Sequence, residues 1–234
     1  MGAEVTVRNA TQIRVVFLGA PGAGKGTQAK AMVDRFGTPH VSSGDMLREH
    51  KAQGSDLGLK AQTFMDRGEL VPDDLIIAMV IDRISRPGSG DTWILDGFPR
   101  TLPQARSLDQ SLADAAEAGP GLSHVVYFEV PHEDLVRRLT GRRTCSQCGA
   151  IWHTEFKPTQ KHDECDLCGG ELRQRSDDRV EVVQTRLEEY RKQTEPLLDY
   201  YRSRGVLVEV DASRSPDVVF EDLVKSLEMQ GPAS

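Results

Sequence analysis

The sequence predicts an α/β protein whose core is a three-layer α/β/α arrangement around a parallel sheet. Short apolar runs, typical of buried parallel strands, alternate along the chain with longer segments of helical patterning. A glycine-rich segment joins the first apolar run to the first helical segment, and two stretches interrupt the alternation as insertions. Alternating strands and helices form a parallel sheet covered on both faces, which binds ligands at the carboxyl ends of its strands.

Five apolar runs predict a five-stranded sheet. They occupy residues 13–18, 38–41, 92–96, 124–130 and 206–210. Helices are expected to about residue 36, over about 55–67, from 72 onwards, over 101–117, over 131–140, over about 178–204 and over 216–229, and Ser42 or Ser43 could cap a further helix. Because no strand is predicted between residues 48 and 91, the helical segment there is an insertion that could clamp a second ligand.

The glycine-rich segment at residues 19–27 has the pattern of a phosphate-binding P-loop. Its glycines let the backbone curl so that several N–H groups point at one anion, and the helix that follows adds its positive dipole end. Lys25 adds a full charge, and the Thr27 hydroxyl could face Mg²⁺. In most P-loops Ser or Thr directly follows the lysine, whereas here Gly26 separates Lys25 from Thr27. A simple turn would explain the glycines but not the lysine and both flanks, so the segment predicts a nucleoside triphosphate site.

The composition suits a soluble globular protein, with 38% hydrophobic and 28% charged residues among 234. No apolar run approaches membrane-spanning length, and residues 1–12, to which no chemistry is assigned, are too polar for a signal peptide. We therefore expect a cytoplasmic protein with no membrane partner. The net charge of −7 disfavours nucleic acid as a partner. A protein of this charge that binds nucleotides must gather its arginines locally.

Four cysteines form the spacing C-x2-C-x16-C-x2-C within an inserted segment that has no helical or strand periodicity. They are Cys145, Cys148, Cys165 and Cys168. Two such pairs make a closed tetrahedral S4 site, for which zinc is the default metal and iron or cobalt also fit. A closed site predicts a structural role. His153 and His162 are candidate substitute ligands, although we expect both at the surface. A zinc ribbon that binds nucleic acid is the rival interpretation of this module.

Several arginines stand beside loop or turn signals at the ends of predicted elements. They are Arg100, Arg138, Arg142, Arg175 and Arg186. Arg142 and Arg175 lie at the two hinges of the cysteine module. If the module folds over the P-loop, both arginines arrive beside the phosphates and water is excluded, so that a phosphoryl group is transferred rather than hydrolysed.

Taken together, these motifs resemble those of adenylate kinases, and more narrowly of the long-lid bacterial type with a zinc-binding lid. The resemblance covers residues 13–229 and rests on segments 19–27, 43–48, 70–73, 96–101, 141–143 and 175–178. It implies an enzyme that transfers the γ-phosphoryl group of Mg·ATP to AMP and gives two ADP, with a monomer expected. It divides the chain into core (1–41, 72–140 and 177–234), an AMP-binding helical insertion (42–71) and a zinc-ribbon-like lid (141–176).

The resemblance also implies roles for individual residues. ATP would contact Gly22, Ala23, Gly24, Lys25, Gly26, Thr27, Arg142, Ile151, Trp152 and Arg214. AMP would contact Ser43, Arg48, Glu69, Leu70, Val71, Gly97, Phe98, Pro99, Arg100, Gln104, Arg175 and Arg186. Gln104 would form hydrogen bonds with the edge of the adenine base. Lys25 and five arginines would act in catalysis: Arg100, Arg138, Arg142, Arg175 and Arg186. Asp45 and Asp96 would hold Mg²⁺ through its waters.

The proposed reaction matches this residue set. The acceptor is a phosphate oxygen that is already anionic, so no general base is needed, and the sequence shows no candidate triad for one. Catalysis then consists of positioning and charge stabilisation. Departures from the commonest pattern are Ser43 for Thr, Glu69 for Lys and Trp152 for Tyr. The alternatives are another nucleoside monophosphate kinase or a GTP-using relative, a nucleic-acid-associated P-loop ATPase with a zinc ribbon, and a non-catalytic zinc scaffold. A non-catalytic zinc scaffold would leave the P-loop and the arginine set unexplained.

Overall fold

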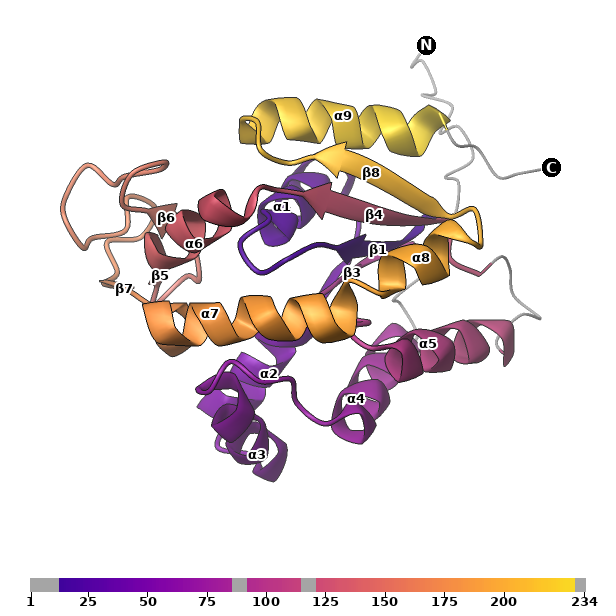
Figure 1. Ribbon diagram of the computed structural model, residues 1–234. Coiled ribbons are helices and arrows are strands. Elements are labelled where there is room, and N and C mark those ends of the chain that lie inside the picture. The colour runs from indigo at the N-terminus through magenta and orange to yellow at the C-terminus, as the bar shows by residue number, and fades with distance from the viewer. Residues whose placement is uncertain (1–12, 86–91, 115–120, 230–234) are drawn as a thin grey trace, which may run out of the picture.

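The protein is built on a five-stranded parallel sheet in a computed structural model that describes residues 13–85, 92–114 and 121–229 (Figure 1). The strands are β1 (Arg14–Leu18), β2 (His40–Ser42), β3 (Trp93–Asp96), β4 (His124–Glu129) and β8 (Leu207–Asp211), in the order β2-β3-β1-β4-β8. Every neighbouring pair is parallel. The five predicted strands are therefore confirmed, and the first strand lies centrally with both of its neighbours supplied by later segments.

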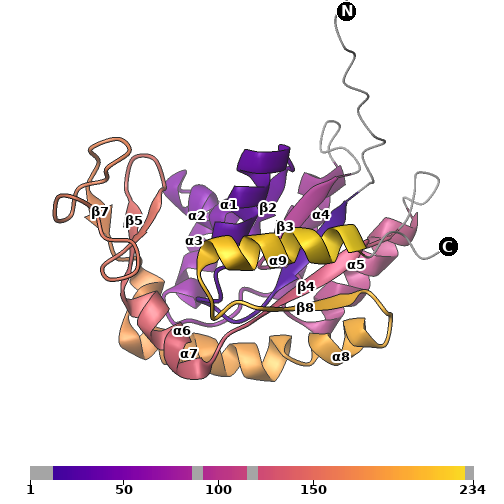
Figure 2. The same cartoon turned by 90° about the horizontal axis from the view of Figure 1, so that it is seen from above.

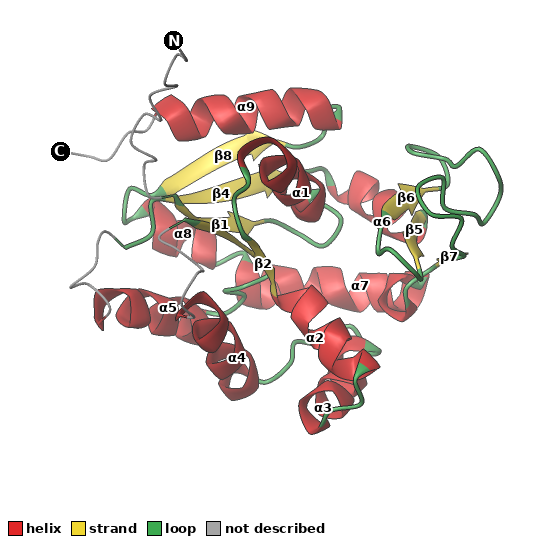
Figure 3. Cartoon of the chain, turned by 180° about the vertical axis from the view of Figure 1, so that it is seen from behind, coloured by secondary structure: helices red, strands yellow, loops and turns green. Residues whose placement is uncertain are grey.

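Helices cover both faces of the sheet. They are α1 (Lys25–Phe36), α2 (Ser43–Ala52), α3 (Asp56–Met65), α4 (Asp73–Ser85), α5 (Leu102–Asp114), α6 (His132–Thr140), α7 (Val180–Glu189), α8 (Leu197–Arg202) and α9 (Pro216–Met229). Alternate β1 side chains point to opposite faces: Val15 and Phe17 pack with α1, α6, α7 and α9, whereas Val16 and Leu18 pack with α4, α5 and α8. Figure 3 shows α1 and α9 on one side of the sheet and α5 and α8 on the other.

The predicted helical insertion is present as α2 and α3, which lie against each other below the sheet in Figure 1. Ser42 caps α2, because its side chain accepts a hydrogen bond from the Asp45 backbone N–H at 3.2 Å. Ser55 caps α3 in the same way. One of the two serines offered as a cap is thus confirmed, and it marks the point where the chain turns from β2 into the insertion.

The prediction of one helix over about 178–204 is wrong. The segment forms a 3₁₀ turn, η2 (Ser176–Asp178), then α7, a π-helical turn, η3 (Tyr190–Thr194), and α8. In the π turn the Glu195 N–H reaches the carbonyl of Tyr190 at 2.9 Å, five residues back. Pro196 follows and has no N–H to continue the helical hydrogen bonds.

The cysteine module folds into a small antiparallel sheet that the sequence did not indicate. Among its described residues, β5 (Arg142–Cys145) lies between β6 (Ile151–His153) and β7 (Leu172–Arg173). Strands of two to four residues are too short to show an alternating pattern. Figure 2 shows the module projecting beyond the core, joined to it through α6 on one side and α7 on the other.

Two parts of the predictions lie outside the described residues: the lead-in at 1–12 and the last part of the helix expected over 101–117. Where the chain is described, none of the helices is both long and apolar enough to cross a membrane.

Candidate active site

The P-loop connects β1 to α1 at the carboxyl edge of the sheet, as the sequence predicted. Gly24 occupies the N-cap of α1 with a φ of +91°, no side chain caps the helix, and its first turn contains no acidic residue. The first N–H groups of the helix therefore remain available to an anion, next to the positive end of the helix dipole.

Glycine is required at Gly22 for two reasons. Its φ is +87°, and a Cβ there would meet Leu139 Cγ at 3.0 Å and the Leu135 carbonyl oxygen at 3.1 Å. Both contacts come from α6, which packs directly against the loop. The same helix leads into the cysteine module, so the P-loop contacts the helix at the base of the module.

Lys25 lies at the centre of this site. Its ammonium donates to the carbonyl oxygens of Gly19, at 2.8 Å, and Ala20, at 3.0 Å. Burial, helped by the nearby Arg100, Arg186 and Arg142 and opposed by Asp96, lowers the pKa of Lys25 to about 8. A polyanion placed beside this ammonium would stabilise its charged form.

Arginines from distant parts of the chain converge on the same space. Burial together with Arg186 lowers the pKa of Arg100 to about 10, and burial together with Arg48 and Arg142 does the same for Arg175. Lowered values show that these cations repel one another in a setting with little water. A group with several negative charges is the ligand that relieves this repulsion.

Asp177 and Asp178 hold the arginines in place. Both lie in segment 175–178, and neither was given a role from the sequence. Asp178, which is fully buried, accepts two hydrogen bonds from Arg142, at 2.7 and 2.6 Å, and one from Arg186 at 3.1 Å. Arg186 also contacts the Asp177 carboxylate at 3.1 Å and donates to its backbone carbonyl at 2.8 Å. Because Arg142 begins β5 and Arg186 lies in α7, these carboxylates tie the module to the core.

A pocket beside this cluster brings together most of the residues expected at the acceptor site. It is lined by Ser43, Gly44, Leu47, Arg48, Met65, Gly68, Glu69, Leu70, Val71, Ile76, Gly97, Arg100, Gln104, Asp177 and Arg186. The lining is apolar where α2, α3 and α4 meet and cationic toward Lys25. Such a gradient suits a ligand with a flat, weakly polar part at one end and a phosphate at the other.

The backbone of Arg100 is held from two sides. Its N–H donates to Gln104 Oε1 at 2.7 Å, and its carbonyl accepts from the Thr194 hydroxyl at 2.8 Å. Its Nε donates to the Gly97 carbonyl at 2.7 Å, which also accepts from Ser43 Oγ at 2.7 Å. Thr194 belongs to the π turn that sequence reasoning missed, so this contact had no signal in the sequence.

Gln104 is buried and also bonds to Asp73, a residue given no role from the sequence. Its Nε2 donates to Asp73 Oδ1 at 2.6 Å, and the Thr101 hydroxyl donates to Asp73 Oδ2 at 2.8 Å. In the sequence Asp73 stands at the end of segment 70–73, which carries the resemblance but gives this residue no role of its own.

The two aspartates expected near Mg²⁺ have different surroundings. Asp96 Oδ2 lies 3.5 Å from His40 Nε2, a partner that the sequence did not indicate. Burial would raise the pKa of the Asp96 carboxyl, but His40 and Lys25 hold it below its ordinary value. Burial likewise opposes the charged form of Asp45, whose pKa is lowered chiefly by its ion pair with Arg48. Both groups are thus carboxylates at neutral pH, the oxygen ligands that Mg²⁺ prefers.

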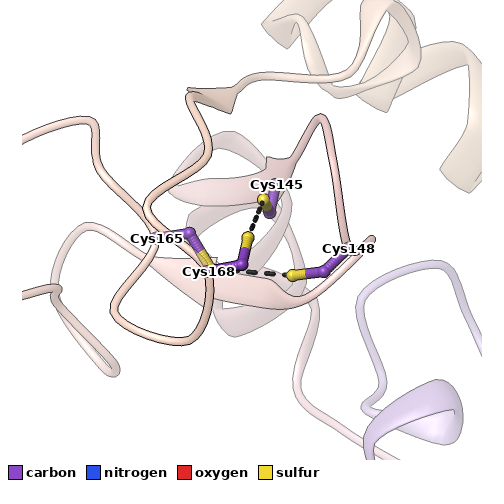
Figure 4. A group of neighbouring side chains, drawn as sticks. All are labelled: Cys145, Cys148, Cys165 and Cys168. Carbon is purple, nitrogen blue, oxygen red and sulfur yellow. Dashed lines mark hydrogen bonds between the residues drawn. The ribbon is translucent and has the colours of Figure 1, made fainter.

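The four cysteines converge on one point, as Figure 4 shows. Their sulfurs all lie within 4.8 Å of one another, with Cys145 and Cys168 3.5 Å apart and Cys148 and Cys165 3.7 Å apart. Four thiolates bound to one zinc ion at about 2.3 Å would be about 3.8 Å apart. The cluster therefore fits a tetrahedral metal, and the metal-binding prediction for this module agrees with the geometry.

The two halves of the cysteine site have the same backbone structure. The N–H of the first cysteine in each pair bonds to the carbonyl five residues later, Cys145 to Ala150 and Cys165 to Gly170. A glycine with positive φ closes each turn. Neither histidine joins the group: His153 Nδ1 accepts from two backbone N–H groups of the next turn, and His162 is exposed.

Two residues expected near ATP, Trp152 and Arg214, and the catalytic candidate Arg138 have other contacts in this conformation. Trp152 is buried in the small core of the module with Cys145 and Cys165. Arg214 pairs with Asp211 and Asp222 beside α9. Arg138 donates to the carbonyls of Ala212, at 2.9 Å, and Ser213, at 3.2 Å, and so holds the loop that carries Arg214. Ile151 is exposed next to the tryptophan.

Comparison with known proteins gives a consistent result. A family model described as adenylate kinase matches residues 17–206. An adenylate kinase of Carboxydothermus hydrogenoformans is 50% identical over 216 residues, covering 92% of this chain and all of the relative. Adenylate kinases of Archaeoglobus fulgidus and Thermodesulfovibrio yellowstonii are 47% and 48% identical over the same length and cover 98% and 99% of their own chains.

Proposed function

Because the chain belongs to the adenylate kinase family, we propose how its residues divide the transfer of a phosphoryl group from Mg·ATP to AMP. The P-loop backbone and Lys25 bind the ATP phosphates. Arg100 and Arg186 bind the AMP phosphate at the other side of the same cation cluster. The observation that supports this division most directly is that Arg100 and Arg186 line one pocket and lie close enough to Lys25 for their charges to act on it.

No residue is needed to remove a proton, since the attacking oxygen of AMP is already an anion. What the site supplies is alignment of two phosphates and neutralisation of the charge that builds up on the transferred group. Lys25 serves this function from the P-loop, Arg142 and Arg175 from the module, and Arg138 and Arg186 from α6 and α7. Asp177 and Asp178 orient Arg142 and Arg186.

The acceptor occupies the pocket between α2, α3 and α4. Its base lies among the apolar residues and beside Gln104, and its phosphate lies toward Arg100. Ser43 supports this end through the Gly97 carbonyl, and Arg48 also lines the pocket. We assign residues 42–71 to the AMP-binding insertion, 141–176 to the lid and the remainder to the core.

Closure of the lid excludes water from the reacting phosphates. Arg142 and Arg175 are at its two ends, and Arg175 Nε donates to Thr144 Oγ1 of β5 at 3.0 Å. A phosphoryl group transferred in a site open to water would be lost to hydrolysis, so closure is what makes the enzyme a transferase.

Asp45, Asp96 and the Thr27 hydroxyl are the oxygen groups that would hold Mg²⁺. When bound, Mg²⁺ neutralises charge on the ATP phosphates. The chain's own residues orient these groups: His40 stands against Asp96, and Arg48 stands against Asp45.

The metal of the cysteine cluster is structural zinc in this proposal, with iron or cobalt as the other metals that such a site accepts. Four thiolate ligands leave no open position for a substrate. The closed geometry supports this assignment over a catalytic one. A monomeric state and a cytoplasmic location remain predictions.

Replacing one arginine tests the assignment. Arg100→Ala should lower the turnover of ATP with AMP by about 10²-fold or more, on the scale of removing one donor from a developing anion. Arg106→Ala, an exposed substitution in the same segment, is the matched control and should leave turnover unchanged. Melting temperatures show whether either variant is misfolded. Normal turnover in Arg100→Ala would remove the proposed role.

A further inference from the structure

Asp73 begins α4 and contacts Gln104, which lines the acceptor pocket, and its two carboxylate oxygens both accept hydrogen bonds. Oδ1 accepts from Gln104 Nε2 at 2.6 Å, and Oδ2 accepts from the Thr101 hydroxyl at 2.8 Å. The Thr101 oxygen in turn accepts from the Gln104 backbone N–H at 3.3 Å. Asp73, Thr101 and Gln104 therefore form a closed ring of hydrogen bonds.

The direction of every bond around the Gln104 amide is determined by its partners. A carboxylate only accepts, so the atom facing Asp73 must be the amide nitrogen. A backbone N–H only donates, so the atom facing the Arg100 N–H, at 2.7 Å, must be the amide oxygen. Turning the amide over would set oxygen against the carboxylate and nitrogen against the N–H. Both hydrogen bonds would become repulsive contacts.

One hydrogen on Nε2 and one lone pair on Oε1 remain after these bonds are made. Gln104 lines the pocket, so this donor and acceptor pair is what it can present to a ligand there. Adenine presents an amino donor next to a ring-nitrogen acceptor, which complements the pair. Guanine has a carbonyl acceptor at the position of that amino group. A glutamine free to turn over would accommodate either base, whereas one of fixed orientation complements adenine.

We propose that Asp73 is a specificity-determining residue, which fixes the orientation of the Gln104 amide and so favours adenine over guanine in the acceptor nucleotide. It acts through Gln104 and is a positioning residue. This inference rests on the proposed function of the pocket as the site of the nucleoside monophosphate.

Asp73→Asn separates this role from a purely structural one. Asparagine has the same shape, and its own amide can turn so that either NH2 or oxygen faces Gln104 while the other faces Thr101. Either orientation of Gln104 would then find a partner at residue 73, and only the Arg100 N–H would still oppose the turned amide. The matched control is Asp74→Asn, which removes the same charge from the same first turn of α4 at an exposed position. Any effect of charge on the helix dipole is common to both variants.

The experiment measures kcat/KM for AMP and for GMP with saturating Mg·ATP in the wild type and both variants. Binding of AMP and GMP without ATP is measured by calorimetry. In Asp73→Asn we expect the ratio of kcat/KM for AMP to that for GMP to fall at least about tenfold, as for one charged hydrogen bond, with KM for ATP unchanged. Asp74→Asn should keep the wild-type ratio.

An unchanged ratio in a folded Asp73→Asn variant would overturn the inference, as would an equal fall in Asp74→Asn. If Asp73→Asn does not fold, Thr101→Val is used instead. It frees one carboxylate oxygen of Asp73, and the ratio should fall by a smaller factor; an unchanged ratio would count against the inference. Failure of the proposed function would look different, because the wild-type protein itself would then show no preference for AMP.

Discussion

At the scale of single residues, Lys25 shows how the fold sets both the affinity and the charge of a group. Burial and neighbouring arginines lower its pKa to about 8, so a substantial fraction of the ammonium groups lose their proton just above neutral pH. A bound triphosphate favours the charged form and raises that pKa again. Binding of the triphosphate should therefore be accompanied by proton uptake at Lys25. The fraction of a proton taken up should increase as the pH rises.

The uptake can be measured by calorimetry in buffers of different ionisation enthalpy, with a non-hydrolysable Mg·ATP analogue. From a pKa of about 8 we expect uptake of about a tenth of a proton at pH 7 and about three-quarters at pH 8.5. Lys30→Met, which removes an exposed lysine from the same helix, should show the same uptake. A binding enthalpy that does not depend on the buffer at pH 8.5 would contradict this picture of Lys25.

Single residues also show the limit of reading the sequence. Lys25 and the four cysteines stand in motifs whose spacing implies their chemistry. His40 and Thr194 stand in no motif, and the motif that contains Asp73 does not reveal its role, because each of the three acts by contacting a residue from another part of the chain. Thr194 reaches the Arg100 carbonyl from 94 positions away. Contacts of this kind depend on the packed structure and leave no local pattern.

At the scale of elements, strands and capped helices were predicted well where periodicity or capping gave a signal. The two failures have separate causes. The long helix was divided because a π turn and Pro196 interrupt hydrogen bonding, although the apolar spacing continues. The antiparallel sheet of the lid was missed because its strands are too short for alternation to appear.

We expect the stability of the proposed lid to depend on a bound metal, since its apolar core is small and consists mainly of Cys145, Ala150, Trp152, Cys165 and Leu172. Cys148→Ser should bind zinc more weakly and lower the melting temperature by at least about 5 °C, while catalysis at low temperature is retained. Removing metal from the wild type with a chelator should produce a similar fall and cause no further fall in the variant. Stoichiometric, tightly held metal in Cys148→Ser would rule out a four-cysteine site.

At the scale of the whole molecule, topology explains why remote segments form one site. The carboxyl ends of β1 and β3 lie side by side in the sheet, which places the P-loop next to Asp96 and Arg100. In Figure 1 the proposed lid projects to the left of the core, and the insertion of α2 and α3 lies below the sheet. The parallel sheet could be predicted from alternating segments, but the strand order could not, because each parallel connection leaves several positions open.

The central claim is that this arrangement transfers a phosphoryl group between nucleotides and excludes water. The most direct measurement mixes the purified protein and Mg·ATP with AMP, GMP, CMP or UMP in turn and follows both nucleoside diphosphate and free phosphate. We predict two ADP for each ATP consumed with AMP, little turnover with the other three, and no appreciable release of phosphate. Phosphate release at the same rate with and without an acceptor would contradict the account.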